Sequence, residues 1–360
     1  MQNTFATLTI GDFIWDIYLY PDKVLPNQEH PRSYKVYVYR DNIEHYKKSG
    51  FGVYKPGGAG NFFLYLVKEN YNLYNVYAKK LSHYFLCPFT SKSEAETAYK
   101  ACIYNMSNEE FKCTNFTIKN VFNEDLLSYN RSILPEKYRI LNKETGKIYI
   151  KFRFDYEFKN NPLKLLSLEE EFYKSLIDNL LLLKKNNLIG ITNLVDYDKY
   201  VFNTFTDSEL SNILKLIYDM TQKIIYVMAK PESAKLLDHL LHIHKNSSNR
   251  LKIIIQVNEF EYQALQKFFE KSLTDTSNVI LIITKGSAGA DCIIHNGNES
   301  KYLTFKQSKP IYGDINTSGA GDVFGASFIN MFLYSKQLLK VSIKYAFLRT
   351  YEYLKILNSL

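Results

Sequence analysis

Beyond about residue 165 the chain alternates helices with apolar strands, and this alternation constrains the fold more than any other feature. Predicted strands at 188–195, 224–229, 251–257 and 278–286 are each preceded by a predicted helix. Strands that are apolar throughout are buried on both faces, so they belong to a parallel sheet with helices on both sides. The sequence therefore predicts an α/β fold with a mostly parallel central sheet.

The first 160 residues follow a different pattern. The run at 5–20 is β-rich and breaks at Gly11-Asp12, and the segment at 32–40 alternates apolar and polar residues as an exposed strand does. The segment at 136–158 predicts a hairpin around NKETGK. We therefore expect one domain over 1–360, with a small separate β-sheet formed by strands within roughly 12–55 and 136–158.

A glycine-rich turn with an acid beside it lies near the C-terminus. Gly319, Ala320 and Gly321 precede Asp322, and apolar residues at helical spacing follow. Small side chains let backbone N–H groups approach an anion closely, and a helix that begins here directs its positive dipole end at that anion. The turn can also serve only to start a tightly packed helix. A carboxylate next to phosphate costs electrostatic energy, which favours a role for Asp322 as a base.

Charge and cysteine content narrow the protein class. The formal net charge is +8, but the lysines are spread along the chain, which argues against a nucleic-acid ligand. Four cysteines show neither CxxC pairing nor metal-ligand spacing, so we expect free thiols in a reducing cytoplasm. No apolar stretch reaches about 18 residues, so we expect no membrane partner.

Six segments, in order along the chain, and the GAGD turn after them resemble the ribokinase (PfkB) family of carbohydrate kinases. The most specific is the GAGD turn, and the branch it resembles most is the D-glycero-β-D-manno-heptose 7-phosphate kinases of ADP-heptose synthesis enzymes. The other matching segments are GDFIWDIYLY, PGGAGN, the KYRIL and RFDYE hairpin, VDYDKY, NEFE and ITKGSAG. The resemblance implies a ribokinase-like three-layer α/β/α fold with a small β-sheet lid.

The resemblance also assigns roles to residues of this chain. Asp322 would be the catalytic base, and the N–H groups of Gly319, Ala320 and Gly321 would stabilise the transferred phosphoryl group. A side chain at Gly321 would block close approach and penalise a positive φ there. The residues implied to bind the sugar are Asp12, Asp16, Gly57, Gly58, Asn61, Arg139, Arg153 and Lys199.

For the nucleotide, the resemblance implies Asn258 and Glu261, which would hold Mg²⁺-bound phosphates of ATP through water, and Thr284, Gly286 and Gly289, which would line it. Each assignment has a plainer alternative. Asp12 and Thr284 occur in ordinary turns, Asn61 could cap its helix, and the arginines and Lys199 could be solvated or paired with surface carboxylates. The implied partner is a small sugar or sugar phosphate, and a homodimer through the lid is expected.

The chain also departs from the family pattern. Asn316 replaces an aspartate linked to a monovalent-cation site, Ala229 replaces an acid after a strand, and Tyr200 replaces a glycine. The family's glycine-containing C-terminal segment is absent, and without a nucleotidyltransferase domain we expect no ADP-heptose synthesis in one chain. Three hypotheses remain: an ATP-dependent sugar kinase, a catalytically impaired relative that binds ligands or regulates, and a nucleic-acid or surface-binding protein.

Overall fold

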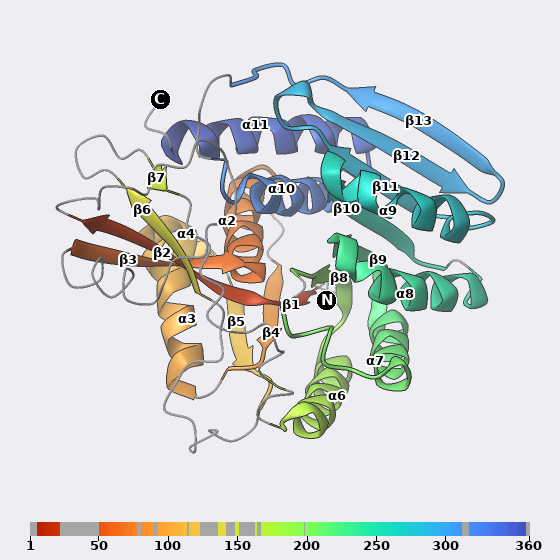
Figure 1. Cartoon of the computed structure of the whole chain (residues 1–360), viewed down its shortest axis with the longest axis horizontal. Helices are drawn as coiled ribbons and strands as arrows, with labels where there is room; N and C mark the ends of the chain where they lie inside the picture. Colours follow the sequence, from red (N-terminus) through yellow and green to blue (C-terminus); the bar gives the residue numbers. More distant parts are fainter. Residues whose placement is uncertain are drawn as a thin grey trace.

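The computed structural model describes residues 6–21, 50–77, 81–89, 92–113, 115–122, 136–141, 148–150, 163, 167–197, 199–248, 250–311 and 317–357. Two sheets occur within these ranges. A nine-stranded sheet has the order β13-β12-β11-β10-β9-β8-β1-β4-β5, and a four-stranded sheet has the order β3-β2-β6-β7. Figure 1 shows the small sheet beside one end of the large one.

The central sheet is parallel over seven strands and antiparallel at one edge. The parallel strands are β1 (Ala6–Gly11), β4 (Ser82–Cys87), β5 (Asn115–Asn120), β8 (Ile189–Val195), β9 (Thr221–Met228), β10 (Lys252–Asn258) and β11 (Val279–Thr284). The antiparallel edge consists of β12 (Ala290–Asn296) and β13 (Glu299–Phe305). The predicted mostly parallel sheet is therefore confirmed.

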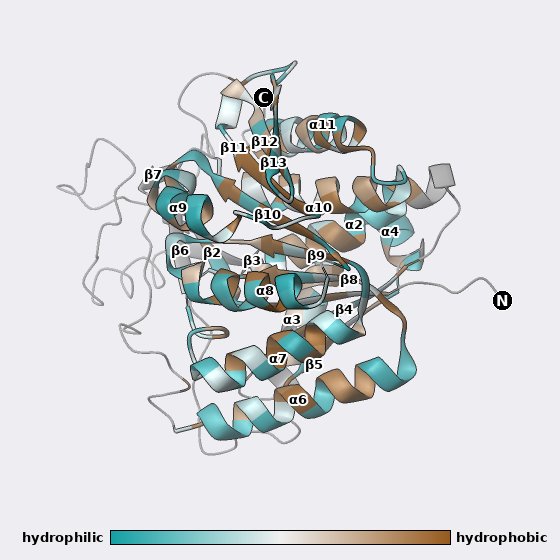
Figure 2. Cartoon of the chain, turned by 90° about the vertical axis from the view of Figure 1, so that its right-hand side faces the viewer, coloured by the Kyte–Doolittle hydropathy of each residue, from teal (hydrophilic) through white to brown (hydrophobic). Residues whose placement is uncertain are grey.

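Helices cover both faces of this sheet. The row on one face contains α6 (Glu169–Asn186), α7 (Asp207–Met220), α8 (Ala234–Asn246) and α9 (Glu259–Ser272). The other face carries α2 (Ala59–Tyr77), α10 (Ala320–Tyr334) and α11 (Leu339–Leu357). In Figure 2, α6, α7 and α8 turn polar residues outward and apolar residues toward the sheet. This segregation buries the apolar strands, such as Ile253, Ile254 and Ile255, which are 0% exposed.

One helix ends earlier than its pattern predicts. The helix predicted before the strand at 224–229 covers 208–223, but α7 ends at Met220 and β9 begins at Thr221. Both the backbone N–H and the hydroxyl of Thr221 donate to the carbonyl of Ile217, the hydroxyl at 2.7 Å, so this residue closes the last turn of the helix. A β-branched residue at this place can therefore end the helix and start the strand without a connecting loop.

The small sheet joins segments that are far apart in the sequence. Its strands are β2 (Phe13–Pro21), β3 (Gly50–Gly58), β6 (Glu136–Leu141) and β7 (Ile148–Ile150). β2 pairs antiparallel with β3 and parallel with β6. The segments at 32–40 and 151–158, expected to be strands, lie outside the described residues. Two further helices are α3 (Lys92–Tyr104) and α4 (Asn108–Cys113). Among the described residues, no helix is long and apolar enough to cross a bilayer.

Candidate active site

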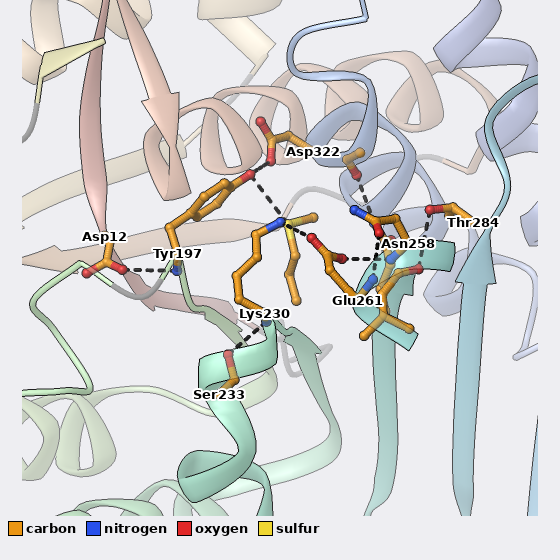
Figure 3. A network of polar contacts seen from close by, with 12 residues as sticks. Asp12, Tyr197, Lys230, Ser233, Asn258, Glu261, Thr284 and Asp322 are labelled. Carbon is orange, nitrogen blue, oxygen red and sulfur yellow. Dashed lines mark hydrogen bonds and ion pairs between the residues drawn. The ribbon is translucent and has the colours of Figure 1, made fainter. Parts of the chain in front are cut away.

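The polar residues of the candidate site follow the carboxyl ends of five neighbouring parallel strands. Asp12 follows β1, Tyr197 follows β8, Lys230 follows β9, Asn258 ends β10 and Thr284 ends β11. Carboxyl ends of parallel strands meet at one edge of a sheet, and ligands of open α/β sheets bind there. Figure 3 shows Tyr197, Lys230, Asn258 and Thr284 along that edge, with Asp322 opposite Tyr197.

The turn before α10 needs a glycine at position 319. Gly319 lies in the left-handed region with φ 79° and is the N-cap of α10. An added Cβ would lie 2.7 Å from Asn61 Nδ2 and 2.7 Å from the Tyr353 hydroxyl oxygen, both closer than real contacts allow. The Tyr353 hydroxyl in turn donates to the carbonyl of Ser318 (2.5 Å). Backbone conformation and space therefore both select glycine here.

Gly321 was expected to need glycine for its conformation, and that expectation is wrong. It lies inside α10, is not among the described glycines with positive φ, and a Cβ there would lie no closer than 3.9 Å to any neighbour. The N–H of Ala320 donates to the carbonyl of Thr317 (3.2 Å). Of the three small residues, only Gly319 is therefore required by the protein's own backbone.

Asp322 is held by two side chains from distant segments. Its carboxylate is only 4% exposed, and it lies in the first turn of α10. Asn61 Nδ2 donates to Oδ2 (2.7 Å), and the Tyr197 hydroxyl donates to Oδ1. Asn61 lies in the third position of α2 and its amide contacts Asp322, so it does not act as the N-cap considered above. Three separate segments thus fix the orientation of this carboxylate.

A buried pair beneath α10 fixes the helix relative to the sheet. Gln256 Nε2, from β10, donates to the carbonyl of Gly321 (3.0 Å). The Tyr226 hydroxyl, from β9, donates to Gln256 Oε1. Both side chains are buried, so their polar atoms need partners within the protein. This contact places the first turn of α10, and with it Asp322, over the ends of the strands.

Asp12 does not face the site as a sugar-binding residue, so that prediction is corrected. Its side chain is 0% exposed, and its two oxygens accept four backbone N–H groups at 2.9–3.1 Å. The donors are Tyr197, Lys199, Tyr200 and Val201. Burial raises the pKa of Asp12, and these donors counteract that effect. Asp12 therefore anchors the loop after β8.

The same loop explains one departure from the family pattern. Tyr200, which stands in place of a glycine, is 0% exposed and donates its hydroxyl to the carbonyl of Phe13 (3.2 Å). Its hydroxyl also contacts Cys87 Sγ (3.3 Å). The tyrosine thus fills the junction between β2 and β4 and is part of the core. Lys199 contributes its backbone N–H to Asp12, and its side chain is half-buried.

Asp16 lies in β2, near the junction of the two sheets. It is 8% exposed and lies opposite Lys55 in the β2–β3 pair. Burial lowers the pKa of Lys55, and Asp16 opposes that shift. A Cβ at Gly57 would lie 2.9 Å from Asp16 Cγ, and Gly58 has φ 56° with the Asp12 carbonyl 2.6 Å from its ideal Cβ. Both glycines are thus required by the close approach of β2 to β3.

On the nucleotide side, Asn258 and Glu261 form the cap of α9. Glu261 N–H donates to Asn258 Oδ1 (2.9 Å), and Asn258 N–H donates to Glu261 Oε2 (2.7 Å). This reciprocal arrangement is a capping box. The other oxygen of Glu261 forms an ion pair with Lys230, whose Nζ lies 5.1 Å from the centre of the Tyr197 ring. Lys230 thus links the acidic cap to the side of the site that holds Asp322 (Figure 3).

The remaining nucleotide-side residues form the turn between β11 and β12. Thr284 donates its hydroxyl to the carbonyl of Val257 (3.3 Å). Gly286 and Gly289 have φ 55° and 115°, and a Cβ at Gly289 would lie 2.0 Å from the carbonyl oxygen of Phe305. Gly289 is therefore fixed by the neighbouring backbone, whereas a Cβ at Gly286 meets nothing within 4 Å.

Some predicted residues cannot be placed in the site. Arg139 lies in β6, where only the backbone is described, and Arg153 and Asn316 lie outside the described residues. Ala229 is 0% exposed and its N–H donates to the carbonyl of Gln256 (3.1 Å). The sequence motifs predicted no role for Tyr197, Lys230 or Gln256. Tyr197 lies within the VDYDKY match, which was the available signal, whereas the roles of Lys230 and Gln256 depend on contacts between strands.

Comparisons with known proteins support the fold. No protein-family model and no curated protein sequence matches the chain. Among solved structures, adenosine kinase from Sinorhizobium meliloti is similar, with TM-score 0.55 and 13% identity over 98% of this chain and 94% of that one. Adenosine kinase from Schistosoma mansoni in complex with 2-fluoroadenosine has TM-score 0.53 and 13% identity, covering 97% and 94%.

The chain is also similar in structure to a sugar kinase. Ribokinase from Arabidopsis thaliana, complexed with ribose and ATP, has TM-score 0.50 and 15% identity, covering 96% of this chain and 90% of that one. Each of these comparisons covers at least 96% of this chain and at least 90% of the other chain. At these identities the similarity concerns the fold. The chain therefore has the ribokinase-like fold, a three-layer α/β/α domain with a mostly parallel central sheet and a small additional β-sheet.

Proposed function

We propose that this chain is an ATP-dependent carbohydrate kinase whose catalytic base is Asp322. The observation that carries the proposal is the position of Asp322, which lies in the first turn of α10 at the carboxyl edge of the sheet. A carboxylate placed there costs electrostatic and desolvation energy, which a base for phosphoryl transfer would justify. Asn61 holds one carboxylate oxygen, which orients the other toward the acceptor.

In the proposed reaction an acceptor hydroxyl oxygen attacks the γ-phosphorus of ATP. Its proton passes to Asp322, the bond from the γ-phosphorus to the bridging oxygen breaks, and ADP leaves. Backbone N–H groups at 319–321 and in the first turn of α10 would stabilise charge on the transferred group. Glycine at 319 lets the turn pack against Asn61 and Tyr353, because a Cβ at this position would collide with both side chains.

The nucleotide phosphates would lie between α10 and the cap of α9. A bound Mg²⁺ would supply positive charge that offsets the charge of the phosphates. Glu261 suits this place because its carboxylate, 12% exposed, lies at the sheet edge and contacts Lys230. It would hold the hydrated ion through water, together with Asn258. Thr284, Gly286 and Gly289 would line the nucleotide.

For the acceptor we propose a sugar or sugar phosphate bound beneath the small sheet, which would act as a lid. Asp16 and Asn61 would bind hydroxyl groups of the sugar. For a phosphate group, the cations would come from Arg139, Arg153 and Lys199. These cations favour a phosphorylated sugar such as a heptose 7-phosphate. The structurally similar enzymes bind ribose and 2-fluoroadenosine, so the acceptor panel must include ribose and nucleosides.

We further propose a cytoplasmic protein that forms a homodimer through the small sheet. The described cysteines Cys87, Cys102 and Cys292 are free and buried, which agrees with a reducing compartment. The small sheet has unpaired edges at β3 and β7 among the described strands, and such edges are commonly covered by another chain.

The test is ADP release and phosphoryl transfer with a panel of sugars, sugar phosphates and nucleosides. Asp322→Asn keeps the size of the side chain and removes the base, so turnover should fall by roughly 10²-fold or more while nucleotide binding changes little. Asp178→Asn, an exposed position on α6, is the matched control. Unchanged turnover in Asp322→Asn would refute the assignment of the base. ATP binding without turnover on any acceptor would favour the catalytically impaired binding protein.

A further inference from the structure

Tyr197 contacts the carboxylate oxygen that the proposed base would use. Asn61 Nδ2 donates to Oδ2 of Asp322, and the Tyr197 hydroxyl donates to Oδ1. A base receives its proton along a hydrogen bond from the attacking hydroxyl to a carboxylate oxygen. The phenolic O–H therefore makes the same kind of contact that an acceptor O–H must make, and it makes it on the oxygen that Asn61 leaves for the acceptor.

The backbone of Tyr197 is fixed, so this contact is built into the fold. Its N–H donates to Asp12 Oδ2 (3.0 Å), and the next three described residues of the loop are bound to the same carboxylate. Its ring lies beneath Lys230 Nζ, 5.1 Å from the ring centre, and its hydroxyl is 3.6 Å from Met228 Sδ. Figure 3 shows the ring extending from the Asp12 anchor to Asp322.

The phenol remains a hydrogen-bond donor at all physiological pH values. Burial raises its pKa well above the ordinary value, and the negative charge of Asp322 raises it further. A neutral phenol can be exchanged for a neutral sugar hydroxyl with one O–H···carboxylate bond lost and one gained. A water molecule that takes the same place gives up contacts in solution for a half-buried site and brings no other binding energy.

We propose that Tyr197 is a positioning residue that occupies the acceptor place on Asp322 and keeps water from the base until an acceptor hydroxyl displaces it. This inference rests on the proposed kinase function and adds a basis for its specificity against hydrolysis. In the suppressed side reaction, water attacks the γ-phosphorus, the bond to the bridging oxygen breaks, ADP leaves and the proton of water passes to Asp322.

The test compares Tyr197→Phe with the parent protein. Phenylalanine keeps the ring beneath Lys230 and removes only the O–H. ADP release without any acceptor should rise by about tenfold, because a hydrogen bond to a charged group no longer competes with water. With an acceptor present, its KM should fall by a similar factor while kcat changes little. The readout is the ratio of ADP release without acceptor to kcat for transfer at saturating acceptor, which should rise with hydrolysis, whereas a merely structural role would lower both rates together.

The matched control is Tyr334→Phe on α10. It also removes a buried hydroxyl, which donates to Asn70 Oδ1 (2.6 Å) at the far end of the helix from Asp322. Its ratio of hydrolysis to transfer should equal that of the parent. Thermal unfolding and a nucleotide-binding measurement confirm that both variants are folded and bind ATP.

The outcomes separate this inference from the proposed function. Transfer in the parent with an unchanged hydrolysis ratio in Tyr197→Phe would overturn the role of Tyr197 alone. A gain in intact mass of one phosphoryl group at Tyr197 would also overturn it, because the phenol would then be an acceptor. If neither protein hydrolyses ATP nor transfers phosphate, both proposals fail. A silent parent with an active Tyr197→Phe variant would support both.

Discussion

At the scale of single residues, burial decides what a polar side chain does. Asp12 belongs to a sequence motif that resembles a sugar-binding acid, but it is wholly buried and binds four backbone N–H groups. Asp322, nearly as buried, binds the side chains of Asn61 and Tyr197, and we propose that an acceptor displaces the second of them. The difference lies in the partners, because backbone donors within a tight loop cannot move aside for a ligand.

Replacement of Asp12 by asparagine should destabilise the fold. The amide retains one acceptor oxygen and turns an NH₂ group toward two backbone donors, so two of the four hydrogen bonds are lost. Hydrogen bonds to a charged group and the unsatisfied donors together predict a loss of about 3 kcal/mol in the free energy of unfolding. Urea unfolding measures this, with the exposed Asp178→Asn as control. A loss equal to that of the control would show that Asp12 does not anchor the loop.

His83 should make stability depend on pH. It is buried opposite Thr7, whose Oγ1 lies 2.8 Å from Nδ1, and burial lowers its pKa from 6.5 to about 3. Between these pH values the unfolded chain binds a proton that the folded protein does not. His83 therefore leaves the free energy of unfolding unchanged above pH 6.5 and lowers it as the pH falls below 6.5. The slope is about 1.4 kcal/mol per pH unit.

The measurement is the free energy of unfolding between pH 7 and pH 4. His83→Gln should flatten the slope over this range, whereas His242→Gln, at an exposed position, should leave it as in the parent. Equal slopes in all three proteins would mean that His83 is protonated in the folded state.

At the scale of secondary-structure elements, α10 depends on its contacts with the strands beneath it. The helix places Asp322 through the bond from Gln256 to the carbonyl of Gly321, and Tyr226 orients Gln256. Gly325 lets the helix approach these two side chains, since a Cβ there would lie 2.3 Å from the Tyr226 hydroxyl oxygen and 3.0 Å from Gln256 Oε1. The contacts of the helix with β9 and β10 therefore set the position of Asp322.

Gly325→Ala should destabilise the protein even though alanine favours helices. The clash with Tyr226 forces either the helix or the buried hydroxyl to move, with a cost of about 1–3 kcal/mol. Gly321→Ala is the matched control in the same helix, because its Cβ has room, and it should be neutral or stabilising by about 1 kcal/mol. The additional change Tyr226→Phe should restore part of the loss in Gly325→Ala, which a double-mutant cycle of unfolding free energies measures.

At the scale of the whole molecule, the site is an assembly of strand ends that are distant in the sequence. The register pairs Gly11 with Val195, Val195 with Met228, and Asn258 with Thr284. Tyr197, after β8, and Gln256, in β10, contact the first turn of α10. This helix comes from the C-terminal part of the chain (Figure 1). A ligand bound at these strand ends would connect segments that are far apart in the sequence, so its binding should stabilise the folded protein as a unit.

Mg²⁺-ATP should therefore raise the melting temperature. At a free concentration of 100 times Kd, binding contributes about 2.7 kcal/mol to the folded state. Glu261→Gln should weaken this shift because it removes the carboxylate proposed to hold the hydrated ion. Glu209→Gln removes the same capping-box carboxylate from α7, where it contacts Thr206, and should keep the shift. Equal shifts in both variants would show that Glu261 acts only as a cap.

Much of the architecture was readable from the sequence because its signals are local. The period of the apolar residues beyond 165 predicted the parallel sheet and its helices, and the break at Gly11-Asp12 coincides with the end of β1 and the start of β2. The end of α7 was misplaced by three residues, because Thr221, Gln222 and Lys223 are polar and carry no apolar pattern that separates the end of a helix from the start of a strand. The sequence pattern did not predict the strands β4, β5, β12 and β13.

The sequence by itself determined the alternation of elements and the need for a small, flexible turn before Asp322, since both depend on residue type and spacing. The tertiary structure decided which side chains meet. It joined β2 to β6 across more than a hundred residues, turned Asp12 to the loop rather than to a ligand, and brought Tyr197 and Asn61 to the two oxygens of Asp322. Such contacts depend on strand order and register, which arise only when the whole sheet has formed.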